Sequence, residues 1–214
     1  MRKVLEIGGV VAGAVLIAFG VAAIVLGVNG RNTVATNLKQ QQIVGTPDMT
    51  PSGIAAEAKS AGLPSSIPLP TCTIANKQVT TGAQARCFAE YMQIHAYEAT
   101  GGVPYSQMPR YASPDGKGTN DASKATKGAN GQPLDNAARD VWVTETALTS
   151  ALNMSYMAEQ LGMFGIVVGV ALLLSGVGFV ILALGGALSA GGWLFARSQK
   201  KSGEAPKSAA PAAG

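Results

Sequence analysis

Apolar residues gather in two long blocks, separated by a mostly polar segment. The first block covers residues 4–28 and contains one charged residue, Glu6, whereas the second covers residues 161–196 and contains none. A helix needs about 20 apolar residues to cross the bilayer core, so each block predicts a transmembrane helix. We therefore expect transmembrane helix 1 in residues 1–28, an extracytoplasmic domain in 29–160, a transmembrane helix 2 region in 161–196 and a disordered cytoplasmic tail in 197–214.

The second block is longer than one crossing requires. As a helix it would extend more than about 50 Å, whereas the hydrocarbon core is about 30 Å thick. We place the span at roughly residues 164–188, with Trp193 and Phe195 as interfacial anchors. The first block is longer than the apolar part of a cleaved signal peptide and no convincing cleavage site follows it. A retained anchor is therefore expected there, and a cleaved signal peptide is the alternative.

Turn residues and helical periodicity predict two short helices in the intervening segment. Thr50 is suited to be an N-cap and Pro51 the first helical residue, so the stretch 54–61 is expected to form a short helix. Thr80 or Thr81 can cap a second helix that runs to about Thr100. One face of this second helix is apolar. It consists of Ala85, Phe88, Ala89, Met92, Ala96 and Ala99.

A third helix is expected to start near Asp135 and to continue into the second apolar block, because no proline occurs between Pro133 and Pro206. Residues 113–133 contain no large apolar side chain, which predicts a flexible loop. The expected fold is mainly α. Two transmembrane helices flank a small, disulfide-linked, mostly helical extracytoplasmic domain with a long flexible loop.

The charges give the predicted spans a direction. The formal net charge is +4, with +1 at the start of the chain, +3 after the second block, and ten basic and ten acidic residues in 29–160. Basic residues beside transmembrane helices tend to stay in the cytoplasm. We therefore expect a plasma-membrane protein with both termini cytoplasmic. The basic residues do not cluster with aromatic ones, so no nucleic-acid partner is expected.

Cys72 and Cys87 are the only cysteines, and both fall in the segment predicted to lie outside the cytoplasm. That compartment is oxidising, so a structural disulfide is expected. In the chain-entropy model, closing such a loop contributes about 3 kcal/mol to stability.

His95 is the only histidine, and Glu98 follows it by one helical turn. A histidine and a carboxylate at this spacing can share a proton or a metal ion. The alternative is a histidine at the edge of the helix, hydrogen-bonded to Glu98. One histidine without a free thiol needs two carboxylates to complete a three-ligand zinc site. We therefore predict no catalytic residue, metal or cofactor.

Glycines recur at seven-residue spacing in both apolar blocks. Small residues let helix backbones approach closely in lipid, so these glycines predict packing between the two helices and with another subunit. The alternative is that glycine is simply frequent in this chain. The predicted packing residues are Gly9, Gly13, Gly20 and Gly27 in the first block, and Gly162, Gly169, Gly176, Gly178, Gly185 and Gly192 in the second.

Residues 80–102, TTGAQARCFAEYMQIHAYEATGG, flanked by two apolar blocks, resemble uncharacterised two-transmembrane proteins of actinobacteria. The resemblance covers most of residues 1–196. Some such proteins carry the label "aromatic ring-opening dioxygenase LigA", which implies ferrous iron held by two histidines and a carboxylate. With one histidine, this chain cannot build that site alone.

The expected function is a non-enzymatic cell-envelope interaction or scaffold protein. Its expected partners are the lipid bilayer and either another membrane protein or further copies of the chain. The alternatives are an accessory subunit of a membrane transport or enzyme complex, or a metal-dependent ring-opening dioxygenase.

Overall fold

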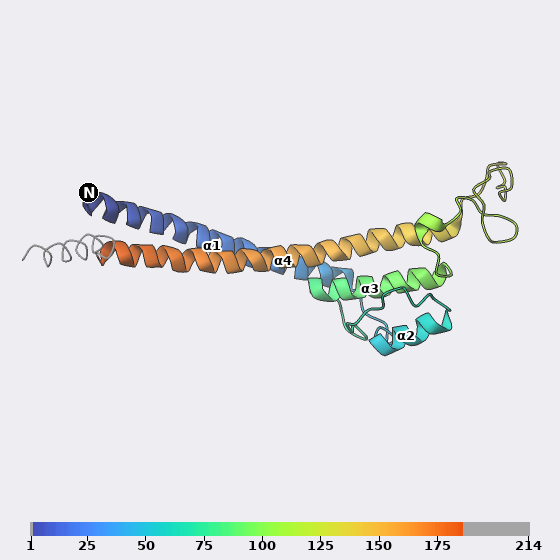
Figure 1. Cartoon of the computed structure of the whole chain (residues 1–214), viewed down its shortest axis with the longest axis horizontal. Helices are drawn as coiled ribbons and strands as arrows, with labels where there is room; N and C mark the ends of the chain where they lie inside the picture. Colours follow the sequence, from blue (N-terminus) through green and yellow to red (C-terminus); the bar gives the residue numbers. More distant parts are fainter. Residues whose placement is uncertain (1, 186–214) are drawn as a thin grey trace, which may run out of the picture. The chain divides into compact units, whose positions relative to one another are not determined.

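The computed structural model describes residues 2–185 and is mainly helical, as the sequence predicted (Figure 1). No strand occurs in this range. The elements are α1 (Arg2–Gln41), α2 (Pro51–Ser60), α3 (Gly82–Ala99), the short 3₁₀ helix η1 (Tyr105–Gln107) and α4 (Ala137–Leu184). The chain divides into two compact units. We call residues 2–27 together with 164–185 the helix pair, and Val28–Met163 the folded domain.

Helices α1 and α4 are each long and apolar enough to cross a membrane. Helix α1 continues past the first apolar block to Gln41. Helix α4 begins two residues later than predicted, where the Asn136 side chain accepts a hydrogen bond from the N–H of Ala138 at 3.1 Å. It then runs to Leu184 without interruption, as the absence of proline predicted. Residues 186–214, with Gly192, Trp193, Phe195 and the predicted tail, lie outside the described residues.

Both short helices start where the sequence predicted. The Thr50 side chain accepts the N–H of Gly53 at 3.0 Å, and Pro51 is the first residue of α2. At α3 the cap is Thr81, whose side chain accepts the N–H of Gln84, while the Gln84 side chain accepts the N–H of Thr81. This reciprocal arrangement satisfies N–H groups that have no partner inside the helix.

The core of the folded domain is built around α3. Tyr91 and Ile94 of α3 are fully buried together with Ile54 of α2. The predicted disulfide between Cys72 and Cys87 is confirmed, and it attaches the segment before α3 to the first half of that helix. The phenolic hydroxyl of Tyr91 donates to the carbonyl oxygen of Cys72 at 2.6 Å, so a second bond holds the same segment on α3.

Glycines bring the two helices of the helix pair into backbone contact. A Cβ atom built on Gly20 would lie 2.7 Å from the carbonyl oxygen of Gly169, and one built on Gly169 would lie 2.7 Å from that of Gly20. Gly13 and Gly176 approach each other in the same reciprocal way, at 2.7 and 2.6 Å. Real Cβ atoms essentially never come within 3.0 Å of such atoms, so a larger residue would force the backbones apart.

The second apolar block carries two glycine stripes with seven-residue spacing, and the two differ in their surroundings. The described part of the first stripe consists of Gly162, Gly169 and Gly176, and that of the second consists of Gly178 and Gly185. Gly169 and Gly176 face α1, whereas a Cβ atom on Gly178 would have nothing within 4 Å. Gly185 directly follows α4, and among residues 2–185 a Cβ atom built on it would meet only the carbonyl oxygen of Ile181. Gly9, Gly27 and Gly162 are buried. Within residues 2–185, the glycines of the second stripe, Gly178 and Gly185, thus lie away from the contact with α1.

The outward surface of the helix pair is mostly apolar. Large apolar side chains there are strongly exposed, among them Val4 at 73%, Phe19 and Phe164 at 66%, and Leu184 at 76%. Continuous exposed apolar surface of this kind is rare on soluble proteins and marks contact with a membrane or another protein.

The long loop at residues 113–133 has more internal structure than its composition predicted. The backbones of Tyr111 and Thr119 exchange two hydrogen bonds of 2.9 Å. The N–H of Leu134 donates to the carbonyl oxygen of Thr126 at 2.8 Å. The flexible-loop prediction considered only the lack of large apolar side chains. Pairing between main-chain groups, which composition does not report, gives this loop its path.

Candidate functional site

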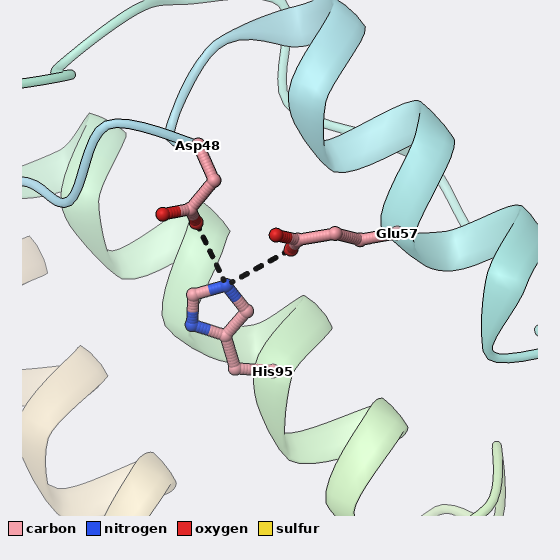
Figure 2. A group of neighbouring side chains, drawn as sticks. All are labelled: Asp48, Glu57 and His95. Atoms are coloured by element: carbon pink, nitrogen blue, oxygen red, sulfur yellow. Dashed lines mark ion pairs between the residues drawn. The ribbon is translucent and has the colours of Figure 1, made fainter.

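Asp48, Glu57 and His95 come together in the folded domain from three separate segments (Figure 2). Asp48 lies in the turn before α2, Glu57 on α2 and His95 on α3. Nε2 of His95 lies 3.7 Å from Oδ2 of Asp48 and 3.6 Å from Oε2 of Glu57. We call these three residues the acidic–histidine cluster.

The packing of α2 on α3 places Glu57 opposite His95. Ile54 and Ala58 of α2 are buried in the same core as Ile94 of α3. Glu57 lies directly before Ala58 and His95 directly after Ile94, so both side chains emerge at the edge of this buried contact. The hydrophobic contact between α2 and α3 therefore brings these two side chains to the same place.

The backbone around Asp48 fixes the third member of the cluster. The next residue, Met49, is buried, and its carbonyl oxygen accepts the N–H groups of Ile74 and Ala75 at 3.2 Å each. On the other side, a Cβ atom built on Gly53 would lie 2.2 Å from the carbonyl oxygen of Asp48. Glycine at position 53 thus lets the first turn of α2 approach Asp48 closely.

The cluster is half-buried and remains open to solvent. The side chains of His95, Asp48 and Glu57 are 28%, 31% and 37% exposed. Within residues 2–185, the structure records no hydrogen bond from any of the three side chains. A protonated His95 would form an ion pair with both carboxylates, and a neutral His95 would leave Nε2 free to act as a ligand.

Glu98, the partner predicted for His95, is not bonded to it in the structure. In the described residues no hydrogen bond joins it to His95, whose nearest acidic oxygens belong to Asp48 and Glu57. Oε1 of Glu98 is buried without a hydrogen-bond partner. Burial raises the pKa of this carboxyl; the charge of His95 opposes the rise, and those of Glu57 and Asp48 add to it. Glu98 thus lies within electrostatic reach of the cluster.

His95 also lines a cavity of about 520 Å³ between α3 and α4, inside the folded domain. Most of the lining is apolar, and its buried acid, Glu145, accepts hydrogen bonds from the hydroxyls of Thr149 at 2.8 Å and Thr146 at 3.3 Å. The remaining lining residues are Met92, Ala96, Ala137, Asp140, Val141, Thr144 and Leu148. A mainly apolar hollow with a few fixed polar groups is the usual form of a ligand site.

Comparison with known proteins gives no relative. No family model, curated protein or solved structure matches this chain. The site must therefore be interpreted from its own geometry.

The donor set does not fit the iron centre that the ring-opening dioxygenase label implies. That centre needs two histidines and one carboxylate. The acidic–histidine cluster offers one histidine and two carboxylates, and the chain contains no second histidine. We derive no reaction through such an iron centre.

The sequence pointed to His95 but not to Asp48 or Glu57. Asp48 stands in a turn-forming run with prolines at both ends, and Glu57 stands in a short alanine-rich helix. Neither has a local spacing that relates it to His95. They become neighbours only because α2 packs on α3, a tertiary contact that local patterns do not encode.

Proposed function

We propose that this chain is a two-span plasma-membrane protein. Both termini lie in the cytoplasm and residues 29–160 lie outside it. The disulfide between Cys72 and Cys87, located in the segment between two apolar helices, is the observation that carries this proposal. Stable disulfides belong to oxidising compartments, and the positive charges of the sequence lie at the two ends of the chain.

The folded domain acts by binding rather than by catalysis. Its cavity between α3 and α4 combines apolar walls with the carboxylate of Glu145, which a hydrogen bond from Thr149 keeps in place. This combination suits recognition of a partner or ligand. The function is therefore that of an envelope interaction or scaffold protein, which keeps a binding domain at the outer surface of the membrane.

The helix pair supplies the anchor and a surface for assembly. One glycine stripe of α4 is used against α1, while a Cβ atom built on Gly178 would meet no atom of residues 2–185 within 4 Å. In lipid, a free small-residue stripe favours close packing with another helix. A membrane-protein partner or a second copy of the chain would pack there.

The binding role is tested by mild detergent extraction, affinity purification and quantitative mass spectrometry. Thr144 is exposed and lines the cavity, so Thr144→Trp should obstruct it and reduce recovery of the partner. Ala151→Trp, at an exposed position of the same helix outside the cavity, is the matched control and should leave recovery unchanged. Equal recovery with both variants, or no stoichiometric partner at all, would contradict the proposed role.

Two results would favour the alternatives. Stable recovery of transporter subunits would identify an accessory subunit of a transport complex. An enzymatic activity of the purified chain that His95→Ala abolishes would identify an enzyme.

A further inference from the structure

The spacing within the acidic–histidine cluster is too long for direct hydrogen bonds. Nε2 of His95 lies 3.7 and 3.6 Å from the nearest oxygens of Asp48 and Glu57, whereas N–H···O bonds span about 2.7–3.2 Å. One donor atom from each residue lies within 4.8 Å of the other two. Three polar side chains thus converge on a small common volume at ion-pair distances, without hydrogen bonds between them.

A bound metal ion accounts for such spacing. Zn²⁺ binds histidine nitrogen and carboxylate oxygen at about 2.0–2.2 Å, so two ligands of a tetrahedral site lie about 3.4 Å apart. The two separations from Nε2 are within a few tenths of an ångström of that value, and all three ligand atoms lie within 4.8 Å of one another. A small shift of flexible side chains would complete the geometry.

We propose that Asp48, Glu57 and His95 form a binding site for a divalent transition-metal ion, with Zn²⁺ as the best match. The imidazole nitrogen favours this class over Ca²⁺ and Mg²⁺, which prefer sites made of oxygen ligands. Two carboxylates and one neutral imidazole form a charge of −2, which a divalent cation neutralises. The fourth position is open to solvent, since the three side chains are 28–37% exposed.

Two observations outside the three ligands support the site. First, the hydrophobic core and the backbone around Asp48 already hold the ligands in place, which reduces the cost of assembling them. Second, Oε1 of Glu98, one turn along α3 from His95, is buried without a hydrogen-bond partner. This acidic oxygen has no donor of its own, and a bound cation nearby would stabilise the ionised form of the carboxyl.

The site would join α2 and the turn before it to α3. The disulfide already joins the Cys72 segment to the same helix. Metal binding would thus add a second cross-link within the folded domain, on the side of α3 that carries His95. This goes beyond the proposed binding role, and the membrane anchor does not depend on it.

The test is zinc titration of the full-length chain, purified in detergent with an affinity tag free of histidine and stripped with a chelator. We expect uptake of one Zn²⁺ per chain, with a higher unfolding temperature, and no displacement by millimolar-range Ca²⁺ or Mg²⁺. His95→Ala and Glu57→Gln should each weaken zinc binding by more than about tenfold, because loss of even an outer partner of a metal ligand costs about 10–100-fold.

Asp121→Asn is the matched control. Asp121 is a carboxylate in the long loop, held by Ser123, and is not part of the cluster. It should bind zinc as the wild type does. The helical circular dichroism and the intact disulfide verify that each variant is folded. Substoichiometric zinc uptake by the folded wild type, or unchanged affinity in folded Glu57→Gln, would overturn the proposal. Displacement by Ca²⁺ or Mg²⁺ would overturn the assigned metal class.

Discussion

At the scale of single residues, Glu159 connects three helical segments of the folded domain. Its Oε2 accepts the N–H of Gly82, the first residue of α3, at 2.6 Å, and its Oε1 lies 3.6 Å from Arg31. A carboxylate at a helix N-terminus satisfies an N–H group without a partner and interacts favourably with the helix dipole. Glu159 is 16% exposed, so solvent screens these interactions only in part.

We predict that Glu159→Ala lowers the free energy of unfolding by about 2 kcal/mol, because it removes a charged hydrogen bond. Urea unfolding in detergent, followed by circular dichroism, measures this change. The control is Glu90→Ala, which removes an exposed pair with Arg86 on the surface of α3 and should cost less than about 0.5 kcal/mol. Equal effects of the two substitutions would show that Glu159 has no special role.

We predict that Glu98 makes stability depend on pH. Its pKa is raised in the folded chain, chiefly by burial, so the unfolded chain ionises first as the pH rises. The stabilisation from neutral Glu98 is therefore full below the usual glutamate pKa and is lost as the pH rises through the folded-state pKa. Glu98→Gln, which cannot ionise, should match the wild type at acidic pH and exceed its stability at neutral pH.

Unfolding temperatures measured at a series of pH values, with a chelator present, decide this prediction. The difference between Glu98→Gln and the wild type should grow across the range above the usual glutamate pKa. If the two chains lose stability in parallel, another group controls the pH dependence.

At the scale of the elements, the close approach of α1 and α4 rests on glycine. Gly169→Ala would place a Cβ atom 2.7 Å from the carbonyl oxygen of Gly20, so the helices must separate. We expect a loss of about 1–3 kcal/mol, the usual cost of overpacking. Gly178→Ala meets nothing within 4 Å, and should be neutral or stabilising because alanine favours helix.

Thermal unfolding in the same detergent compares the two glycine variants. Gly169→Ala should unfold at a lower temperature than the wild type, and Gly178→Ala should not. The opposite order would mean that the glycine contact contributes nothing to the helix pair.

Local sequence signals predicted most of the elements. Threonine caps and proline located the starts of α2 and α3, and the absence of proline predicted the uninterrupted α4. The disulfide followed from the presence of two cysteines and the expected compartment. These features depend on neighbours in the chain or on composition, which the sequence displays directly.

The candidate site could be predicted only in part. His95 was visible as the single histidine, but its neighbours come from α2 and the turn before it, far away in the chain. Glu98 was the obvious local partner, yet the packing of α2 on α3 brings Asp48 and Glu57 closer to Nε2. The pairing of loop 113–133 was missed for a related reason, since main-chain hydrogen bonds leave little trace in side-chain composition.

At the scale of the whole molecule, the central claim is that the chain crosses the plasma membrane twice and holds the folded domain outside the cytoplasm. The natural cysteines form a disulfide, and Cys72 is half-buried, so its thiol becomes available after reduction. Ser202→Cys adds one further thiol in the predicted cytoplasmic tail. In the proposed topology, the two positions report on opposite sides of the membrane.

The most direct test is labelling of intact cells with a membrane-impermeant maleimide, with and without prior treatment by an impermeant reductant. If the proposed topology holds, Cys72 is labelled in intact cells only after reduction, whereas Ser202→Cys is labelled only after lysis. Labelling of Cys72 confined to lysed cells, or labelling of Ser202→Cys in intact cells, would contradict the proposed topology.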